Sequence, residues 1–287
     1  MPVYRSERLF QFLNALFFVV VGFLMLAPML HVLAVSLSST EFVDAGQVYL
    51  WPKGLTFFIY EHIFGQKTLW RALGVSVYIT VLGTLIYLAF TSTLAYALSR
   101  PYMPKRALIM KGIVITFIFS VPLIPHFLIV HYLGMTNTLW ALMIPGAIGA
   151  FGVILMKTFF QGISSEIFDA GYIDGCSEFG IFLRIAAPLS LPSFATMGLF
   201  HAVGQWNAYF GALIFIRSKE LFPIQIVLRG MIVNENSPDF KLLTDMHITP
   251  ETLKSGIVIF ATLPIIIVYP FLQKYFVKGA QLGSLKE

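Results

Sequence analysis

Long stretches without a charged side chain dominate this sequence and restrict what it can fold into. Five such stretches contain no Asp, Glu, Lys or Arg, and they are Leu9–Thr40, Ala72–Ser99, Gly112–Met156, Ile185–Ile216 and Ser255–Gln273. A helix needs about 20 apolar residues to cross about 30 Å of hydrocarbon. Charged residues make up only 11% of the chain, against about 25% in a soluble domain. The sequence therefore predicts an integral membrane protein.

The stretch Gly112–Met156 is too long for one crossing, and a polar turn at Gly134–Thr138 divides it into two. We therefore expect an all-α fold, a polytopic membrane bundle of six transmembrane helices. The expected spans are Leu9–Ser36, Ala72–Ser99, Ala107–Leu133, Leu139–Phe160, Leu189–Ile216 and Ser255–Phe276. The first is longer than the apolar part of a signal peptide, so we expect it to stay uncleaved. In the fourth, small residues permit close helix packing: Gly146, Gly149 and Gly152.

The short connections predict which side of the membrane each loop faces. The connection after the second span contains Arg100, Lys105 and Arg106, whereas the turn after the third span has no charge. Cytoplasmic loops carry an excess of Lys and Arg, so the first connection and both termini are predicted to be cytoplasmic. Two longer loops, about 37–71 and 217–254, are then outside. The same rule explains the basic balance of the chain, and we expect no nucleic acid partner.

A polar segment, Ser164–Pro192, connects two long charge-free stretches and has the pattern of two short helices. Ser164 or Ser165 can cap the first helix, because a hydroxyl accepts a hydrogen bond from an otherwise unpaired amide. Gly175 can end it in a left-handed conformation. Ser177 can cap the second helix. Apolar residues recur in that helix at helical spacing, and they are Phe179, Phe182, Leu183 and Ala186.

The charge of this segment favours a protein partner over a lipid surface. Its acidic residues are Glu166, Asp169, Asp174 and Glu178, against the single basic residue Arg184. Helices that rest on anionic lipid usually carry Lys and Arg on their polar face. We therefore expect a water-side element, joined to spanning helices at both ends, on which another protein acts.

The segment resembles the cytoplasmic loop that characterises permeases of binding-protein-dependent ABC importers. That pattern is Glu-Ala-Ala, three residues, Gly, nine residues, Ile, one residue and Leu-Pro. This chain matches it with Asp169-Ala170-Gly171, Gly175, Ile185 and Pro188. Three positions depart from the pattern without changing the spacing, since Asp169 replaces Glu, Gly171 replaces Ala and Ala187 replaces Leu.

Further motifs resemble the carbohydrate-uptake class of these permeases, including Gly204-Gln205-Trp206-Asn207 and the ending Gln273–Gly279. Others, Tyr49–Pro52 and Gly134–Ala141 among them, are similar to the subgroup that imports oligo- and polysaccharides, including alginate-type and lipo-oligosaccharide-type permeases. The resemblance covers nearly the whole chain.

The resemblance implies a type-1 ABC importer permease fold in the bacterial inner membrane. Residues 1–287 would form a single transmembrane permease domain, with a coupling helix in the cytoplasmic loop 161–188. Its partners would be a second homologous permease in a heterodimer, two ATPase subunits, an extracytoplasmic solute-binding protein and membrane lipid. The residues implied to contact an ATPase are Glu166, Asp169, Ala170, Gly171, Asp174, Gly175, Phe179 and Phe182.

The resemblance also implies that ATP and Mg²⁺ bind to the ATPase subunits, and this chain has no Gly-x-x-x-x-Gly-Lys-Ser/Thr phosphate loop of its own. We expect no enzyme activity, no catalytic residue, no metal and no cofactor on this chain.

Polar and aromatic groups in the fifth expected span are candidates for the substrate pathway, and they are Gln205, Trp206, Asn207 and Tyr209. Polar groups inside a span are costly unless they face protein or water, so helix–helix hydrogen bonding explains them equally well. We expect the histidines of the spans to make such bonds rather than to relay protons: His126, His131 and His201.

The predicted function is ATP-driven import of a carbohydrate, an oligo- or polysaccharide such as alginate, into the cytoplasm. One alternative is a permease of the same kind for another solute, such as a peptide. The other is an ion-coupled secondary carrier. A carrier predicts ionisable groups within the spans and an inverted repeat, and the charge-free stretches count against it.

Overall fold

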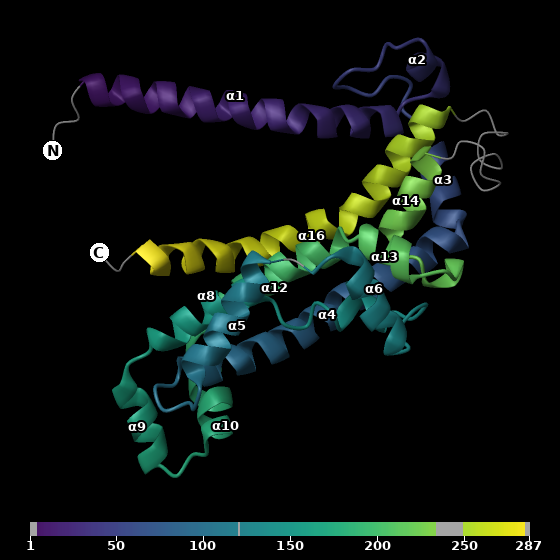
Figure 1. Ribbon diagram of the computed structural model, residues 1–287. Helices are drawn as coiled ribbons and strands as arrows, with labels where there is room; N and C mark the ends of the chain where they lie inside the picture. Colours follow the sequence, from purple (N-terminus) through teal and green to yellow (C-terminus); the bar gives the residue numbers. More distant parts are fainter. Residues whose placement is uncertain (1–4, 120, 234–248, 285–287) are drawn as a thin grey trace. The chain divides into compact units, whose positions relative to one another are not determined.

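The computed structural model describes residues 5–119, 121–233 and 249–284, and this part of the chain is helical (Figure 1). The helices are α1 Arg5–Ser36, α2 Thr40–Asp44, α3 Phe58–Gly65, α4 Lys67–Ser99, α5 Arg106–Ile118, α6 Leu123–Tyr132, α7 Trp140–Met143, α8 Ala150–Gln161, α9 Ser165–Ile173, α10 Glu178–Ile181, the π-helix η1 Phe182–Ala186, α11 Ala187–Leu189, α12 Leu191–Trp206, α13 Phe210–Phe215, the 3₁₀-helix η2 Lys219–Leu221, α14 Ile224–Val233 and α16 Pro250–Ser284. The described residues contain no strand, which confirms the all-α expectation. The middle of the expected outer loop 217–254, residues 234–248, lies outside the described residues.

Three described helices are long and apolar enough to cross a membrane: Glu7–Ser36, Lys67–Ser99 and Pro250–Pro270. Two bent pairs raise the number to five if each is one span. One is α5 with α6, bent by 118°, and the other is Glu178–Leu189 with α12, bent by 81°. The expected fourth span holds the short α7 and the 12-residue α8. The count of six spans therefore stays a prediction.

Residues between α7 and α8 leave the helical conformation, and α4 satisfies part of their backbone. The hydroxyl of Thr91 donates to the Ala147 carbonyl at 3.3 Å and accepts from the Gly149 amide at 3.4 Å. Non-helical backbone inside a membrane protein is tolerated where protein groups replace the missing hydrogen bonds. The break is thus stabilised by a side chain of the neighbouring helix.

The stripe of small residues predicted in the fourth span does allow close packing. A Cβ atom at Gly149 would lie 2.9 Å from Cε2 of Tyr87 in α4, and one at Gly152 would meet the Tyr87 hydroxyl. The Tyr87 ring also stacks on His201 at 4.2 Å, and His201 Nδ1 lies 3.1 Å from the hydroxyl of Thr84. His201 therefore bonds to a neighbouring helix, as expected.

The chain divides into two compact units, each made of two segments. The first unit combines the residues up to Trp70 with Leu228–Pro264, and the second combines Arg71–Val227 with the residues from Ile265 on. In the first unit, α3 packs so closely on α16 that a Cβ atom at Gly256 would lie 2.8 Å from Cδ1 of Ile63.

The second unit has a core to which α4, α8, α9, α10, η1 and α12 all contribute. Its buried members are Tyr87, Ala95, Tyr96, Leu98, Val153, Met156, Phe160, Phe168, Ile181, Phe182, Ala186 and Met197. Four of these belong to the 164–188 segment, which is therefore part of the core of this unit.

Candidate functional site

The segment 164–188 folds into α9 and α10, which lie side by side beyond the ends of α5 and α8 (Figure 1). A Schellman turn ends α9. Gly175 has a φ of +76°, the Gly175 amide donates to the Tyr172 carbonyl at 3.0 Å, and the Cys176 amide donates to the Gly171 carbonyl at 3.0 Å. Only glycine adopts this backbone conformation without strain. The predicted stop at Gly175 is confirmed.

The two predicted serine caps have different outcomes. The Ser177 hydroxyl accepts from the Gly180 amide at 3.2 Å and so caps α10, as predicted. Ser164 occupies the N-cap position of α9, but its side chain makes no capping hydrogen bond.

The four apolar residues predicted on one face of the second helix separate into two groups. Phe182 and Ala186 are buried, whereas Phe179 is 63% exposed and Leu183 is 51% exposed. The helix becomes a π-helix over Phe182–Ala186, and a π turn contains more residues than an α turn. The wider turn changes the angular spacing of these side chains, which the regular periodicity could not predict.

Of the eight residues implied to contact an ATPase, six are exposed: Glu166, Asp169, Ala170, Asp174, Gly175 and Phe179. The other two, Gly171 and Phe182, are buried. Gly171 is where α9 approaches η1, because a Cβ atom there would lie 2.8 Å from Cδ1 of Ile185. This close approach gives a physical reason for glycine at that position.

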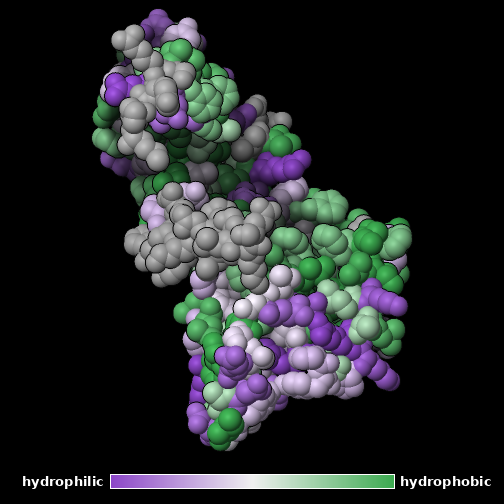
Figure 2. All heavy atoms as spheres, turned by 90° about the vertical axis from the view of Figure 1, so that its left-hand side faces the viewer, coloured by the Kyte–Doolittle hydropathy of each residue, from purple (hydrophilic) through white to green (hydrophobic). Residues whose placement is uncertain are grey.

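The exposed surface of α9 and α10 mixes acidic and apolar side chains. Ile173 is 87% exposed and lies next to the exposed Asp174. In Figure 2 the lowest part of the molecule, where these helices lie, is largely hydrophilic with a small hydrophobic area. An exposed apolar group within a polar rim is typical of a protein contact.

Aromatic packing attaches the segment to α4 and α8. The ring of Phe182 lies 5.1 Å from that of Tyr96 in α4 and 6.2 Å from that of Phe160 in α8. Aromatic pairs at such distances contribute about 0.5–1.5 kcal/mol beyond their buried area. Because these rings belong to one core, α9 and α10 pack directly against α4 and α8.

Arg100, at the end of α4, makes a second attachment. It is only 8% exposed, and its guanidinium carbon lies 3.6 Å from the ring centre of Phe168 in α9 and 4.6 Å from that of Tyr96. Its Nε donates to the Ser99 hydroxyl at 3.2 Å. In the sequence, Arg100 indicated only which side of the membrane its loop faces, and its contact with Phe168 was not predicted.

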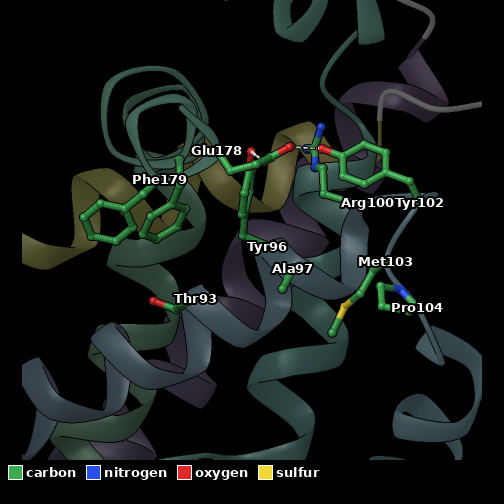
Figure 3. A pocket seen from close by; sticks show the side chains of 10 residues that line it. Thr93, Tyr96, Ala97, Arg100, Tyr102, Met103, Pro104, Glu178 and Phe179 are labelled. Atoms are coloured by element: carbon green, nitrogen blue, oxygen red, sulfur yellow. Dashed lines mark hydrogen bonds between the residues drawn. The ribbon is translucent and has the colours of Figure 1, made fainter. Parts of the chain in front are cut away.

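Glu178, the first residue of α10, accepts hydrogen bonds from three phenols, two of which, Tyr96 and Tyr102, are drawn in Figure 3. Tyr96 donates to Oε2 at 2.9 Å, and Tyr102 and Tyr172 both donate to Oε1. We call Glu178, Tyr96, Tyr102 and Tyr172 the Glu178 network. A cavity adjoins it, lined by residues of α4, of the connection 100–104, of α10 and of η1 (Figure 3).

The electrostatics of the Glu178 network favour an ionised carboxylate. Burial by itself would raise the pKa of Glu178, but hydrogen bonds from Tyr102, Tyr172 and Tyr96 outweigh it and hold the pKa below its ordinary value. Burial and the bond to this carboxylate raise the pKa of the Tyr102 phenol, which therefore stays a donor. From the sequence, Glu178 was expected to be an acidic residue at the start of the second helix, as it is, but its hydrogen bonds to the phenols were not predicted.

The four candidates for the substrate pathway lie where α12 ends and α13 has not yet begun. Gln205 donates to the Leu142 carbonyl at 2.7 Å, and Asn207 donates to the Val203 carbonyl of its own helix at 2.9 Å. Trp206 is 6% exposed, and its indole nitrogen has no hydrogen-bond partner among the described residues. Tyr209 is half-buried. The Gln205 bond joins α12 to α7, which is the helix–helix hydrogen bonding given above as the alternative to a substrate-contacting role.

No protein-family model matches the chain. Protein LplC of Bacillus subtilis is 39% identical over 98% of this chain and 96% of its own length. The polygalacturonan/rhamnogalacturonan transport system permease protein YtcP of the same organism is 39% identical over 98% of this chain and 99% of its own. A crystal structure of a bacterial ABC transporter involved in the import of the acidic polysaccharide alginate contains a chain with a TM-score of 0.90 and 32% identity, covering 96% of this chain and 100% of that one.

Proposed function

The chain belongs to the permease proteins of carbohydrate ABC importers, and from this membership we propose that it is the spanning subunit that moves an oligo- or polysaccharide, such as alginate, from a binding protein into the cytoplasm. The observation that carries the proposal is the 164–188 segment. Its exposed face carries acidic and apolar side chains, and its other face is built into the core of α4, α8 and α12. Such an element can transmit a displacement from a docked protein to the spanning helices.

Packing between two loops supports a cytoplasmic position for this segment. Arg100, in the connection between the second and third expected spans, contacts Phe168 of α9, so the two loops lie on the same side of the membrane. Cytoplasmic loops are enriched in Lys and Arg, and the first connection also contains Lys105 and Arg106. With six spans, both termini are then cytoplasmic too.

The proposed assembly contains a second homologous permease, two ATPase subunits and an extracytoplasmic binding protein in the bacterial inner membrane. Closure of the ATPases on ATP and Mg²⁺ displaces α9 and α10, which act together as the coupling element. ATP has to favour one arrangement of the spans over the other for this displacement to do work. Hydrolysis belongs to the partner subunits, because this chain has no phosphate loop.

The names of the similar proteins support a polymeric sugar as substrate. One relative is a permease for polygalacturonan and rhamnogalacturonan, and the structural neighbour takes part in alginate import. We place the route beside the break between α12 and α13, with Gln205, Trp206, Asn207 and Tyr209 as its candidate contacts. Replacing Trp206 with Leu tests this placement, because it should change sugar uptake more than it changes ATP hydrolysis.

The experiment that tests the function is reconstitution of the complete transporter in lipid vesicles. We expect uptake of alginate oligosaccharides that requires ATP and the binding protein, and that persists after ion gradients are collapsed. Uptake that follows an ion gradient without ATP would identify a secondary carrier instead. ATP-dependent uptake of peptides, with none of sugars, would contradict the substrate class alone.

The docking surface has its own test. We expect Phe179→Arg to reduce the amount of ATPase that co-purifies with the permease, because a charged side chain would replace an exposed apolar one on α10. Trp51→Arg is the matched control, since Trp51 is 82% exposed but belongs to the expected outer loop. Equal ATPase recovery from both variants would place the docking surface elsewhere.

A further inference from the structure

The Glu178 network joins four segments through one carboxylate. Tyr96 comes from α4, Tyr102 from the connection after α4, Tyr172 from α9, and Glu178 begins α10. Figure 3 shows the labelled phenols of Tyr96 and Tyr102 directed at the Glu178 carboxylate from different sides. The bond between Tyr172 and Glu178 spans the Schellman turn at Gly175. The same carboxylate therefore closes the turn between α9 and α10 and ties that turn to α4.

The acceptor at the centre of the network has to be a carboxylate. An ionised carboxylate only accepts hydrogen bonds and has about four acceptor sites, which suits three converging phenols. Bonds to an ionised acceptor are about twice as strong as neutral ones. An amide in the same place would present a donor to one of the phenols and would lose the charge.

The nearby Arg100 does not take the place of the phenols. Among the described residues no salt bridge joins Arg100 to Glu178, and the guanidinium stacks on Phe168 and Tyr96 instead. The carboxylate is thus oriented by directional hydrogen bonds from three segments rather than by one cation. A loose ion pair would permit sliding between the segments, whereas three bonds to two oxygens restrict it.

Two of the three phenols contribute little to the core. Tyr102 is 61% exposed and Tyr172 is 38% exposed, so removing either hydroxyl leaves the buried apolar contacts in place. The bonds of these residues fix the relative position of α9, α10 and α4 more than they add to the stability of the fold. Removing these hydroxyls therefore tests whether they position the segments, without disturbing the packing of the core.

We propose that Glu178 is a positioning residue of the coupling element, and that its bonds to Tyr96, Tyr102 and Tyr172 transmit displacement of the turn between α9 and α10 to α4. The inference rests on the proposed function, in which ATPase closure displaces that turn. When the network is broken, the turn yields to the ATPases without moving α4. ATP is then hydrolysed without the corresponding transport.

The test uses the complete transporter in vesicles, with sugar uptake and ATP hydrolysis measured on the same sample. We expect Glu178→Gln, and Tyr102→Phe with Tyr172→Phe together, each to lower the ratio of sugar transported to ATP hydrolysed about fivefold, as the loss of one or two such bonds suggests. ATPase recovery should stay near that of the wild type for both variants, and the melting temperature should stay near it for the two phenol substitutions, whereas Glu178→Gln also loses the stabilisation that the ionised carboxylate provides. Tyr132→Phe is the control, because Tyr132 is 91% exposed and belongs to α6.

A double-mutant cycle sharpens the test, because removing a phenol from a complex that already carries Glu178→Gln should have little further effect on the ratio. The inference is overturned if the ratio stays at the wild-type value, or if uptake and hydrolysis fall together with the melting temperature. Should Glu178→Gln fail to assemble, Tyr102→Phe alone decides, since its side chain is mostly exposed. A wild-type complex without ATP-driven sugar uptake would instead contradict the proposed function.

Discussion

The guanidinium carbon of Arg100 lies over the ring of Phe168, 3.6 Å from the ring centre. Arg100 follows the last residue of α4, and Phe168 lies in the middle of α9, so the pair joins the end of α4 to α9. Both side chains are nearly inaccessible to solvent. A cation over an aromatic face gains most where water is excluded, which makes this pair a principal attachment of α9.

The first prediction concerns the geometry of this pair. Arg100→Lys keeps the positive charge but loses the planar group that stacks on Phe168. We expect it to lower the free energy of unfolding by about 1 kcal/mol, measured as thermal unfolding in detergent. Arg217→Lys is the control, because Arg217 is exposed. If Arg100→Lys is as harmless as the control, charge alone suffices and stacking contributes nothing.

The second prediction concerns the backbone at Gly175. A Cβ atom there would meet nothing within 4 Å, so the constraint comes from its φ of +76° and not from space. Any residue with a side chain should lose about 1–2 kcal/mol, with Asn losing least because it tolerates the left-handed region, and Val most. We expect sugar uptake to fall in the order Gly, Asn, Ala, Val. The control is Gly112→Ala, which should be harmless because Gly112 lies in α5 with open space around it. Equal damage from Asn and Val at position 175 would favour a steric explanation instead.

The third prediction concerns Gly171, the glycine that stands where the family pattern has alanine. Gly171→Ala should gain about 1 kcal/mol of helix propensity, but its Cβ would press on Cδ1 of Ile185 at 2.8 Å. Ile185→Val removes that atom. We therefore expect Gly171→Ala to be more stabilising in a protein that already carries Ile185→Val than in the wild type. Identical effects in both backgrounds would show that the two residues are not coupled.

Local signals in the sequence were sufficient for the turn between α9 and α10. Gly175 and Ser177 act through backbone groups a few residues away, so their roles follow from chain order alone. The bonds to Glu178 could not be predicted in this way, because Tyr96 and Tyr102 are 82 and 76 residues distant along the chain. Phe182 shows the same limit, since its burial depends on rings from α4 and α8.

The expected spans show why boundaries are harder to predict than membrane character. Hydropathy identified the apolar stretches, but it does not register where a helix stops inside them. Between α7 and α8 the backbone is supported by Thr91 of α4, and only the folded protein brings that hydroxyl to the break. A continuous helix over Leu139–Phe160 was the simplest expectation, and the structure instead divides this range.

The fourth prediction follows from the lowered pKa of Glu178. The folded protein binds the proton less readily than the unfolded chain, whose pKa is close to 4.5. The stabilisation is therefore fully present above that value and is lost as the pH falls through the folded pKa. We expect the melting temperature of the wild type to drop more steeply below about pH 4.5 than that of Glu178→Gln. Parallel curves for the two proteins would mean that the phenols do not favour the ionised form.

The last prediction concerns Asn137, which holds the turn after α6 against the residues that follow α13. Its Oδ1 accepts from the amides of Arg217 at 3.0 Å and Ser218 at 2.9 Å, and its Nδ2 donates to the Ser218 hydroxyl at 2.9 Å. Its φ is +59°, which favours Asn over other residues with side chains. Asn137→Ala loses the side-chain hydrogen bonds and also the tolerance for a positive φ. Asn137→Gly loses only the side-chain hydrogen bonds, and Asn137→Asp loses only the Nδ2 donor.

We therefore expect thermal stability to fall in the order Asn, Asp, Gly, Ala at position 137, with a loss of about 2 kcal/mol for Ala. Asn14→Ala is the matched control, because Asn14 is exposed in the regular helix α1. If Gly were as stable as Asn, the side-chain bonds to Arg217 and Ser218 would be dispensable. If Gly were as unstable as Ala, those bonds would account for the whole effect and the left-handed backbone for none of it.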